Sequence, residues 1–344
     1  PGGYPVGDRF NAMSGLKKVI VPDGTYQTYA GAYRSVLPSG VRMVEKNSDG
    51  YIITDNVLIA YTGADNDIEI PDGVEEIAEG AFQNNTEIER VKLPKTLSKI
   101  GSYAFSGCTG LKTIEFGGNE AAIEDHAFNN CSALTGEIKF SENLTEIKSY
   151  AFAGCSKLEG DLRIPGSVTT VSEYAFNNCA SLNGIMELGN GITTIEKNAF
   201  AGCSKLTGDL VIPDSVTEIG RSAFYNCSGF DGNIKLSDNL KTLDKDVFYN
   251  CSQLSGELVI PDSVTGINYC TFYNCKNITS VVIGENVGNM GTTFYYAEGY
   301  SEADRIGWSP FYGCSKVETI EFKESTPPGG YPVGDRFNAM SGLK

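Results

Sequence analysis

The segment Cys203–Cys227, CSKLTGDLVIPDSVTEIGRSAFYNC, decides the fold, because most of the chain repeats it with small changes. Phe224 marks the phase of the repeat. Equivalent phenylalanines, 23 or 24 residues apart until an interruption after Phe272, are Phe82, Phe105, Phe128, Phe152, Phe176, Phe200, Phe224, Phe248, Phe272, Phe311 and Phe337. A period of this length predicts one elongated solenoid in which each coil buries its apolar face against its neighbours.

Cysteine stands three residues after nearly every marker phenylalanine and should form a second buried column. These residues are Cys108, Cys131, Cys155, Cys179, Cys203, Cys227, Cys251, Cys275 and Cys314. Adjacent coils about 4.8 Å apart hold their Cβ vectors nearly parallel, whereas a disulfide needs them turned toward each other. We therefore expect free thiols in a structural ladder. Cys270 is out of phase, so we expect it to be partly exposed and reactive.

Each coil is expected to hold two short strands and a turn. Leu210 and Ile212 alternate with polar residues in the first strand, Pro213 ends it, and Ile219 lies in the second. The corner around Phe224 is expected to be a turn of 3₁₀ helix. The pattern predicts a mainly β solenoid, with one capping α-helix near residues 25–37, where Ala and Tyr recur at helical spacing before a proline.

The two ends of the sequence are related. Residues 1–17, PGGYPVGDRFNAMSGLK, recur unchanged as residues 328–344. If the second copy, residues 328–344, is followed directly by Lys18 and the residues after it, the repeat pattern continues without a break. In that order, a last coil is followed by a capping segment. This predicts a module repeated in tandem with a period of 327 residues, which is the interval between the two copies. An artificial duplication is the alternative.

These features divide the chain into three parts. Residues 1–43 are interpreted as the last partial coil and C-terminal cap of a preceding module. Residues 44–70 are interpreted as an N-terminal capping hairpin. Residues 71–344 form the repeat array, which carries an aromatic insertion at 294–309 and ends in the repeat of residues 1–17.

Composition argues against several function classes. The net charge is −16 and the basic residues are scattered, so nucleic acid is not an expected partner. No apolar run approaches the length of a membrane span. The acidic cluster Asp65, Asp67, Asp72, Glu75 and Glu76 lacks a calcium-loop signature, and we expect no metal and no cofactor.

Catalysis is not indicated either. The one histidine, His126, lies in a column with Tyr103, Tyr150 and Tyr174, so we interpret it as an exposed repeat position. No pair among the 43 acidic residues is marked out for glycoside hydrolysis. Thr193 and Thr217 belong to a threonine column that suits a strand and could also order ice. We expect a protein that is not an enzyme.

The repeat text resembles the BspA-like leucine-rich repeat family of bacterial and protist cell-surface proteins. The resemblance is carried by LTGDLVIPDSVTEIGRSAFYNC at 206–227, KTLSKIGSYAFSGC at 95–108 and IVPDGTYQTYAGAY at 20–33, and it covers nearly the whole chain. It implies a right-handed leucine-rich-repeat solenoid, an extracellular or cell-surface location, and adhesion or partner binding. It implies no catalytic residues.

Two aromatic features depart from the repeat. Tyr225, Tyr249, Tyr273 and Tyr312 form a column one residue after the marker. The insertion adds Tyr295, Tyr296, Tyr300 and the only tryptophan, Trp308. Because tyrosine and tryptophan anchor interfaces, these eight residues are the candidate binding patch. A purely structural ladder is the alternative interpretation.

We therefore predict a non-enzymatic surface module, tandemly repeated in a larger protein, that binds a protein or glycan ligand. A structural filament or stalk built from neighbouring copies of the same module is a second possibility. A carbohydrate-binding accessory module is a third.

Overall fold

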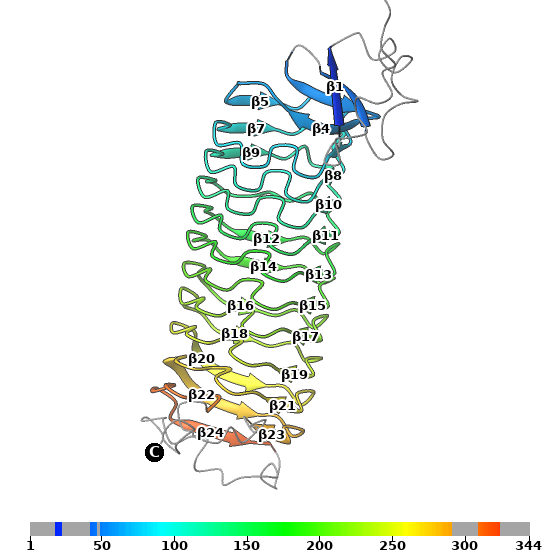
Figure 1. The fold of residues 1–344 in the computed structure, drawn as a ribbon. Helices are drawn as coiled ribbons and strands as arrows, with labels where there is room; N and C mark the ends of the chain where they lie inside the picture. Colours follow the sequence, from blue (N-terminus) through cyan, green and yellow to red (C-terminus); the bar gives the residue numbers. More distant parts are fainter. Residues whose placement is uncertain (1–17, 23–41, 47–48, 291–308, 324–344) are drawn as a thin grey trace, which may run out of the picture.

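The computed structural model describes residues 18–22, 42–46, 49–290 and 309–323. Within these ranges the protein is a β-solenoid with no helix, and its coils stack along one long axis (Figure 1). The expected capping helix at 25–37 lies outside the described residues.

The first strand of each coil contributes to one side of the solenoid, here called the first-strand column (Figure 1). Its strands are β5 (Asp67–Glu69), β7 (Arg90–Lys92), β9 (Thr113–Glu115), β12 (Leu162–Ile164), β14 (Met186–Leu188), β16 (Leu210–Val211), β18 (Ile234–Lys235), β20 (Ser255–Ile260), β22 (Asn277–Ile283) and β24 (Thr319–Phe322). They form four short sheets, within each of which neighbouring strands pair in parallel, as Leu210 of β16 does with Ile234 of β18.

The second strand of each coil forms the second-strand column. Its strands are β6 (Glu76–Ile77), β8 (Lys99–Ile100), β10 (Ala122–Ile123), β11 (Glu146–Ile147), β13 (Thr170–Val171), β15 (Thr194–Ile195), β17 (Glu218–Ile219), β19 (Thr242–Leu243), β21 (Gly266–Ile267) and β23 (Asn289–Met290). These strands also pair in parallel, from β6 to β17 in one sheet and from β19 to β23 in another.

Four further strands extend the second-strand column at its N-terminal end: β1 (Lys18–Pro22), β2 (Arg42–Lys46), β3 (Tyr51–Thr54) and β4 (Val57–Tyr61). β1 pairs with β2 in parallel, whereas β2, β3 and β4 pair antiparallel. β4 then pairs in parallel with β6, so the antiparallel strands lie against the first coil of the array.

The core is a stack of phenylalanine rings along the axis. Phe200 and Phe224, for example, are fully buried, with ring centroids 5.3 Å apart and an interplanar angle of 18°. The leucines, isoleucines and valines of both strand columns surround this stack in one continuous cluster. The same contact between phenylalanine rings therefore recurs from one coil to the next.

All ten cysteines are buried and none forms a disulfide, which confirms the expectation of an unlinked thiol column. Cys270 lies outside that column and was expected to be partly exposed and reactive. Its side chain is only 7% exposed, so the prediction of a partly exposed thiol is wrong. Burial raises its pKa to about 11, which lowers the fraction of reactive thiolate at neutral pH.

The corner of each coil contains the hydrogen bonds of a 3₁₀ turn but is not a continuous helix. Tyr225 N–H donates to Ser222 C=O at 3.1 Å, and Cys227 N–H donates to Phe224 C=O at 3.1 Å. Ser222 and Asn226 both have φ of +58°, in the left-handed region. These two reversals turn the chain back and place Phe224 inside and Tyr225 at the surface.

Candidate functional site

Tyr225, Tyr249, Tyr273 and Tyr312 form the tyrosine ladder, the part of the candidate patch that the structure describes. Each follows a buried marker phenylalanine and is half-buried. Successive ring centroids are 4.8, 4.4 and 5.1 Å apart, and the interplanar angles do not exceed 15°. The four rings thus lie face to face along the solenoid axis.

The backbone of the corner sets this spacing. Asn226 N–H donates to Tyr249 C=O at 2.8 Å, and Asn250 N–H donates to Tyr273 C=O at 2.7 Å. The neighbouring asparagine side chains are also linked, because Asn250 Nδ2 donates to Asn226 Oδ1 at 3.0 Å. Coil-to-coil hydrogen bonds therefore hold the tyrosine ladder rigid without help from a ligand.

The stacking decides which parts of the rings a partner can contact. Each inner ring has another ring on both faces, so a partner could contact its edges but not its faces. Burial and the two neighbouring phenols raise the pKa of Tyr249 to about 12. The Tyr249 hydroxyl group is therefore protonated at neutral pH.

The other candidate residues, Tyr295, Tyr296, Tyr300 and Trp308, lie outside the described residues. Whether the insertion joins the tyrosine ladder therefore stays a prediction. In the sequence, the insertion lies between β23 (Asn289–Met290) and the corner that carries Tyr312.

A second aromatic stack appears in the N-terminal half, here called the mixed ladder: Tyr103, His126, Tyr150 and Tyr174. Its successive centroids are all 4.6 Å apart. His126 is half-buried between two tyrosine rings, which corrects the expectation of an exposed position. Aromatic residues two positions before the marker in four successive coils were the sequence signal for this stack.

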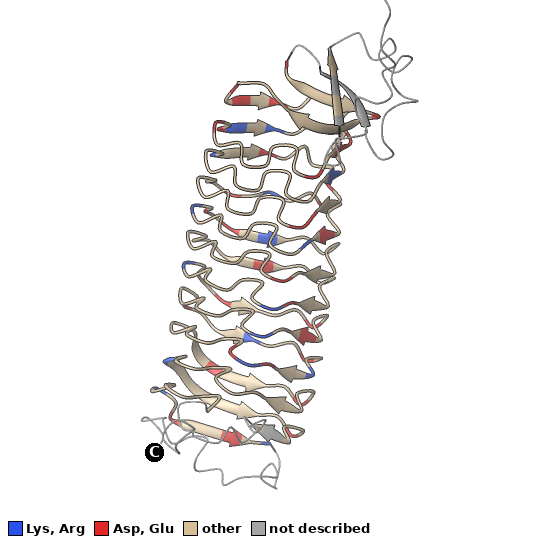
Figure 2. Ribbon diagram, viewed as in Figure 1, with Lys and Arg blue, Asp and Glu red and all other residues tan. Residues whose placement is uncertain are grey.

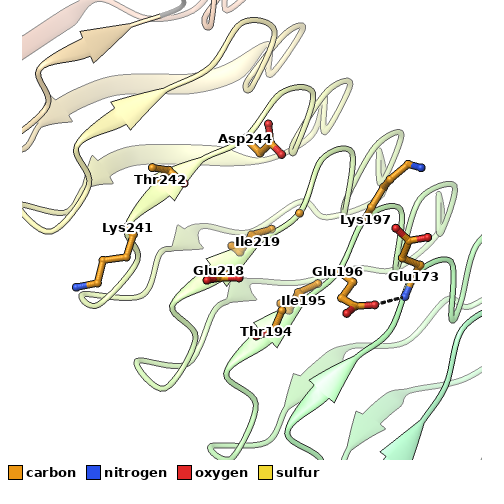
Figure 3. Close-up of a pocket in the computed structure, with 11 residues that line it drawn as sticks. Glu173, Thr194, Ile195, Glu196, Lys197, Glu218, Ile219, Lys241, Thr242 and Asp244 are labelled. Atoms are coloured by element: carbon orange, nitrogen blue, oxygen red, sulfur yellow. Dashed lines mark hydrogen bonds between the residues drawn. The ribbon is translucent and has the colours of Figure 1, made fainter. Parts of the chain in front are cut away.

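The mixed ladder ends against a cation. Lys197 Nζ lies 5.3 Å from the centroid of Tyr174, close enough for a cation–π contact. Beside it is a shallow depression of about 400 Å³ along β15, β17 and β19 (Figure 3). Its lining includes Glu173, Glu196, Lys197, Glu218, Lys241 and Asp244.

This depression has mixed charge, and one of its acids is engaged by the backbone. Glu196 Oε2 accepts a hydrogen bond from the Glu173 amide at 2.8 Å, as the dashed line in Figure 3 shows. No residue of the tyrosine ladder lines the depression. The depression is therefore a separate feature from the tyrosine ladder.

Acidic and basic residues are interspersed along the described part of the chain rather than gathered into one basic stripe (Figure 2). Many pair across adjacent coils, as Lys92 does with Glu69 at 2.5 Å and Lys99 with Glu76 at 3.2 Å. These pairs are exposed, and each contributes little to stability. They match the register that the backbone pairing of the strands sets.

The threonine column is also engaged within the chain. Thr193 Oγ1 donates to Thr169 C=O at 3.2 Å, and Thr217 Oγ1 donates to Thr193 C=O at 3.4 Å. The hydroxyl hydrogens of these two residues are thus directed to the preceding coil, which does not favour an array that orders ice.

Two absences hold for the described ranges. No group of three or more His, Cys, Asp or Glu residues there is placed to hold a metal ion. Within the acidic cluster that the sequence analysis named, Asp67 forms an ion pair with Arg90, in which Oδ1 and Nε are 3.6 Å apart. No helix in the described ranges is long and apolar enough to cross a membrane.

Comparison with known proteins identifies the family. The model of the BspA type leucine-rich repeat region matches in six copies over residues 57–183 and 184–301, well over half of the chain. The chain therefore belongs to the BspA-type leucine-rich repeat family, as its repeat text indicated.

Solved structures include several similar proteins. A leucine-rich cell surface protein from Faecalibacterium prausnitzii is 24% identical, with 88% of this chain and 96% of that one covered and a TM-score of 0.40. A leucine-rich repeat protein from Bacteroides ovatus is 21% identical, with 80% and 91% covered and a TM-score of 0.36. The pneumococcal vaccine antigen PcpA is 17% identical, with 92% and 80% covered and a TM-score of 0.47. A search of curated proteins found no match.

Proposed function

We propose that this leucine-rich repeat module is a non-enzymatic, cell-surface or extracellular adhesion module, and that it binds a protein partner along the tyrosine ladder. Membership of the BspA-type family supports the general role of a repeat module for protein binding. The single observation that carries the choice of site is the stack Tyr225–Tyr249–Tyr273–Tyr312.

The geometry of the stack favours a protein over a glycan. A sugar packs its ring on an open aromatic face, but the faces of the two inner rings are covered by neighbouring rings. A protein can instead contact ring edges and accept or donate hydrogen bonds at the row of hydroxyl groups. Rigid rings also lose little conformational entropy when a partner docks.

The site would form at little cost in free energy. The tyrosine ladder is fixed by coil-to-coil hydrogen bonds before any partner arrives. Because the ladder contains no Asp, Glu, Lys or Arg, binding there should depend weakly on salt, despite the net charge of −16. This distinguishes it from attraction between the acidic chain and a basic surface.

The test measures binding of the full chain to immobilised fibronectin, fibrinogen and laminin, with a glycan array in parallel. The variant Tyr225→Ser/Tyr249→Ser/Tyr273→Ser should weaken binding to any matrix protein that the chain recognises by at least about tenfold, or about 1.4 kcal/mol. The matched control is Tyr103→Ser/Tyr150→Ser/Tyr174→Ser, which removes the same groups from the mixed ladder.

The control should bind like the unchanged chain. Equal loss in both variants would show that ladder stability, rather than contact with a partner, controls binding. Recognition of free glycans with no affinity for the protein panel would overturn the proposal in favour of a carbohydrate-binding module.

A further inference from the structure

Two asparagines of one interior coil are each followed by glycine. Asn183-Gly184 comes just before β14, and Asn190-Gly191 lies in the turn between β14 and β15 (Figure 1). Both asparagines are exposed, and isoleucine follows the glycine in both places. The coil therefore holds the same short sequence in two structural settings.

Asparagine before glycine is the sequence in which the side-chain amide is lost most readily without an enzyme, because glycine has no Cβ to hinder the approach. The glycine nitrogen bonds to the asparagine Cγ, and its proton leaves with the side-chain amide as ammonia. The resulting succinimide ring takes up one water molecule and opens to aspartate or isoaspartate. Nothing is oxidised or reduced. The peptide must rotate for the two atoms to meet, so hydrogen bonds that hold it oppose the reaction.

The preceding coil holds the first of the two asparagines. Asn183 Oδ1 accepts the Gly160 amide at 2.9 Å, and Gly184 N–H, which carries the attacking nitrogen, donates to Gly160 C=O at 3.0 Å. The next amide, that of Ile185, donates to Asp161 Oδ1 at 2.9 Å. These hydrogen bonds must break before the peptide between Asn183 and Gly184 can rotate.

The second asparagine lies in a turn that is held less firmly. The turn is closed by a hydrogen bond of its own, from Ile192 N–H to Gly189 C=O at 3.2 Å. Among the described residues, neither the Asn190 side chain nor the Gly191 N–H has a hydrogen-bond partner. The attacking nitrogen and the amide that it attacks therefore have no bond to the protein that must break first.

The turn two coils further on shows which contacts are missing. There, Asp238 N–H donates to Asp214 Oδ1 of the preceding coil at 3.2 Å, and Asn239 Nδ2 donates to Asp214 C=O at 2.8 Å. In the turn after β14, Gly166 of the preceding coil stands at the position of Asp214, and Gly191 stands at that of Asn239. Because neither glycine has a side chain, this turn lacks both contacts.

We propose that Asn190 is a deamidation site of this module and that the preceding coil protects Asn183 from the same reaction. The fold accepts a carboxylate at the modified position, since Asp214 and Asp238 occupy the equivalent place in the next two coils. The reaction adds one negative charge to an exposed turn without cutting the chain. It involves no residue of the tyrosine ladder.

Incubation of the full folded chain at pH 8 over several days is the first test. Cleavage after glutamate at acidic pH separates the two sites, because Glu187 lies between them. Mass spectrometry of peptides 174–187 and 188–196 then measures the replacement of an amide by a carboxyl group, and fragmentation locates it. Peptide 188–196 should be modified at least about tenfold faster than Asn183 in peptide 174–187.

The unfolded chain provides the matched control. In guanidinium chloride, Asn183 and Asn190 should be modified at similar rates, because both are followed by Gly-Ile. Equal rates in the folded chain would overturn the proposal. The same preference for Asn190 in the folded and the unfolded chain would also overturn it, because local sequence rather than the fold would then control the reaction.

Gly166→Asp tests the role of the preceding coil. A Cβ at Gly166 would meet no atom outside its chain neighbours closer than the Asn190 nitrogen, at 3.9 Å, so an added side chain has room. Its carboxylate should accept the Asn190 N–H, as Asp214 does for Asp238, and slow deamidation at least about threefold. Thermal unfolding verifies that the variant is folded.

Asn190→Gln verifies the assignment, because its longer side chain forms the ring much more slowly. The mass change in peptide 188–196 should disappear in this variant. A rate unchanged by Gly166→Asp, or a mass change that persists in Asn190→Gln, would contradict the proposal.

Discussion

The thiol of Cys227 donates a hydrogen bond to the carbonyl oxygen of Phe200 in the preceding coil, with Sγ and O 3.1 Å apart. The same oxygen accepts the amide of Cys203 in its own coil, also at 3.1 Å. Equivalent thiol contacts run from Cys108 to Cys314. The cysteine column therefore fills space and also satisfies a carbonyl group at every corner.

The first prediction concerns thiol reactivity. In the folded protein at pH 8, a chromogenic disulfide reagent should modify all ten cysteines very slowly, Cys270 included, because all are buried. Burial also raises the pKa of Cys203 to about 12, so almost no thiolate is present. In denaturant all ten should react within the mixing time. Rapid modification of one thiol in the native state would contradict this result.

The second prediction concerns alkaline stability. The pKa of Cys203 is raised from its ordinary value near 9 to about 12 by burial, so above about pH 9 the unfolded chain binds fewer protons than the folded one. The stabilisation is complete below pH 9 and is lost as the pH rises toward 12. Each such thiol should cost about 1.4 kcal/mol per pH unit in that window.

Urea unfolding at pH 7, 8 and 10 measures this effect. The free energy of unfolding should be nearly flat up to pH 8 and clearly lower at pH 10. Cys203→Ala should reduce the slope above pH 9 by the contribution of one thiol. A slope identical to that of the unchanged chain would contradict the assignment.

The third prediction concerns the phenylalanine stack. Phe224→Ala should lower the free energy of unfolding by about 3–5 kcal/mol, because the ring is fully buried between two others and leaves a cavity. Val259→Ala serves as the control, since this side chain is 40% exposed on the first-strand column. Its substitution should change stability by less than about 1 kcal/mol.

The fourth prediction concerns the left-handed residue before each marker. Asn198 has φ of +54°, so Asn198→Ala should destabilise the protein by about 1–2 kcal/mol, while Asn198→Gly should be close to neutral. Tyr150 has φ of +59° and stacks on His126 and Tyr174. Tyr150→Gly should therefore be destabilising despite the relaxed backbone. Thermal unfolding of the three variants provides the comparison.

The periodic residues allowed most of the fold to be predicted. The spacing of Phe200, Phe224 and Phe248 fixes the coil length, and Cys227 at constant phase indicates a free thiol. A position that repeats in every coil experiences the same environment many times, so its sequence signal is strong. The spacing of the marker phenylalanines therefore predicts nearly all of the architecture.

Positions without that repetition were harder to predict. Cys270 occurs once in its phase, and its burial depends on neighbouring coils that the sequence does not show. The mixed ladder was visible as a column, but the stacking of His126 between tyrosines depends on the left-handed backbone at that position. The tyrosine ladder stacks at the spacing of the coils, while its role as a binding site stays a proposal.

The hydrogen bonds between coils lie along the solenoid axis, and this orientation determines how the molecule would respond to force. Pulling on the two ends loads each coil in turn, so the bonds of one coil break together before those of the next. A released coil of 24 residues would extend to about 80 Å, compared with about 5 Å while it is stacked. A tether built this way would lengthen stepwise under tension and absorb work.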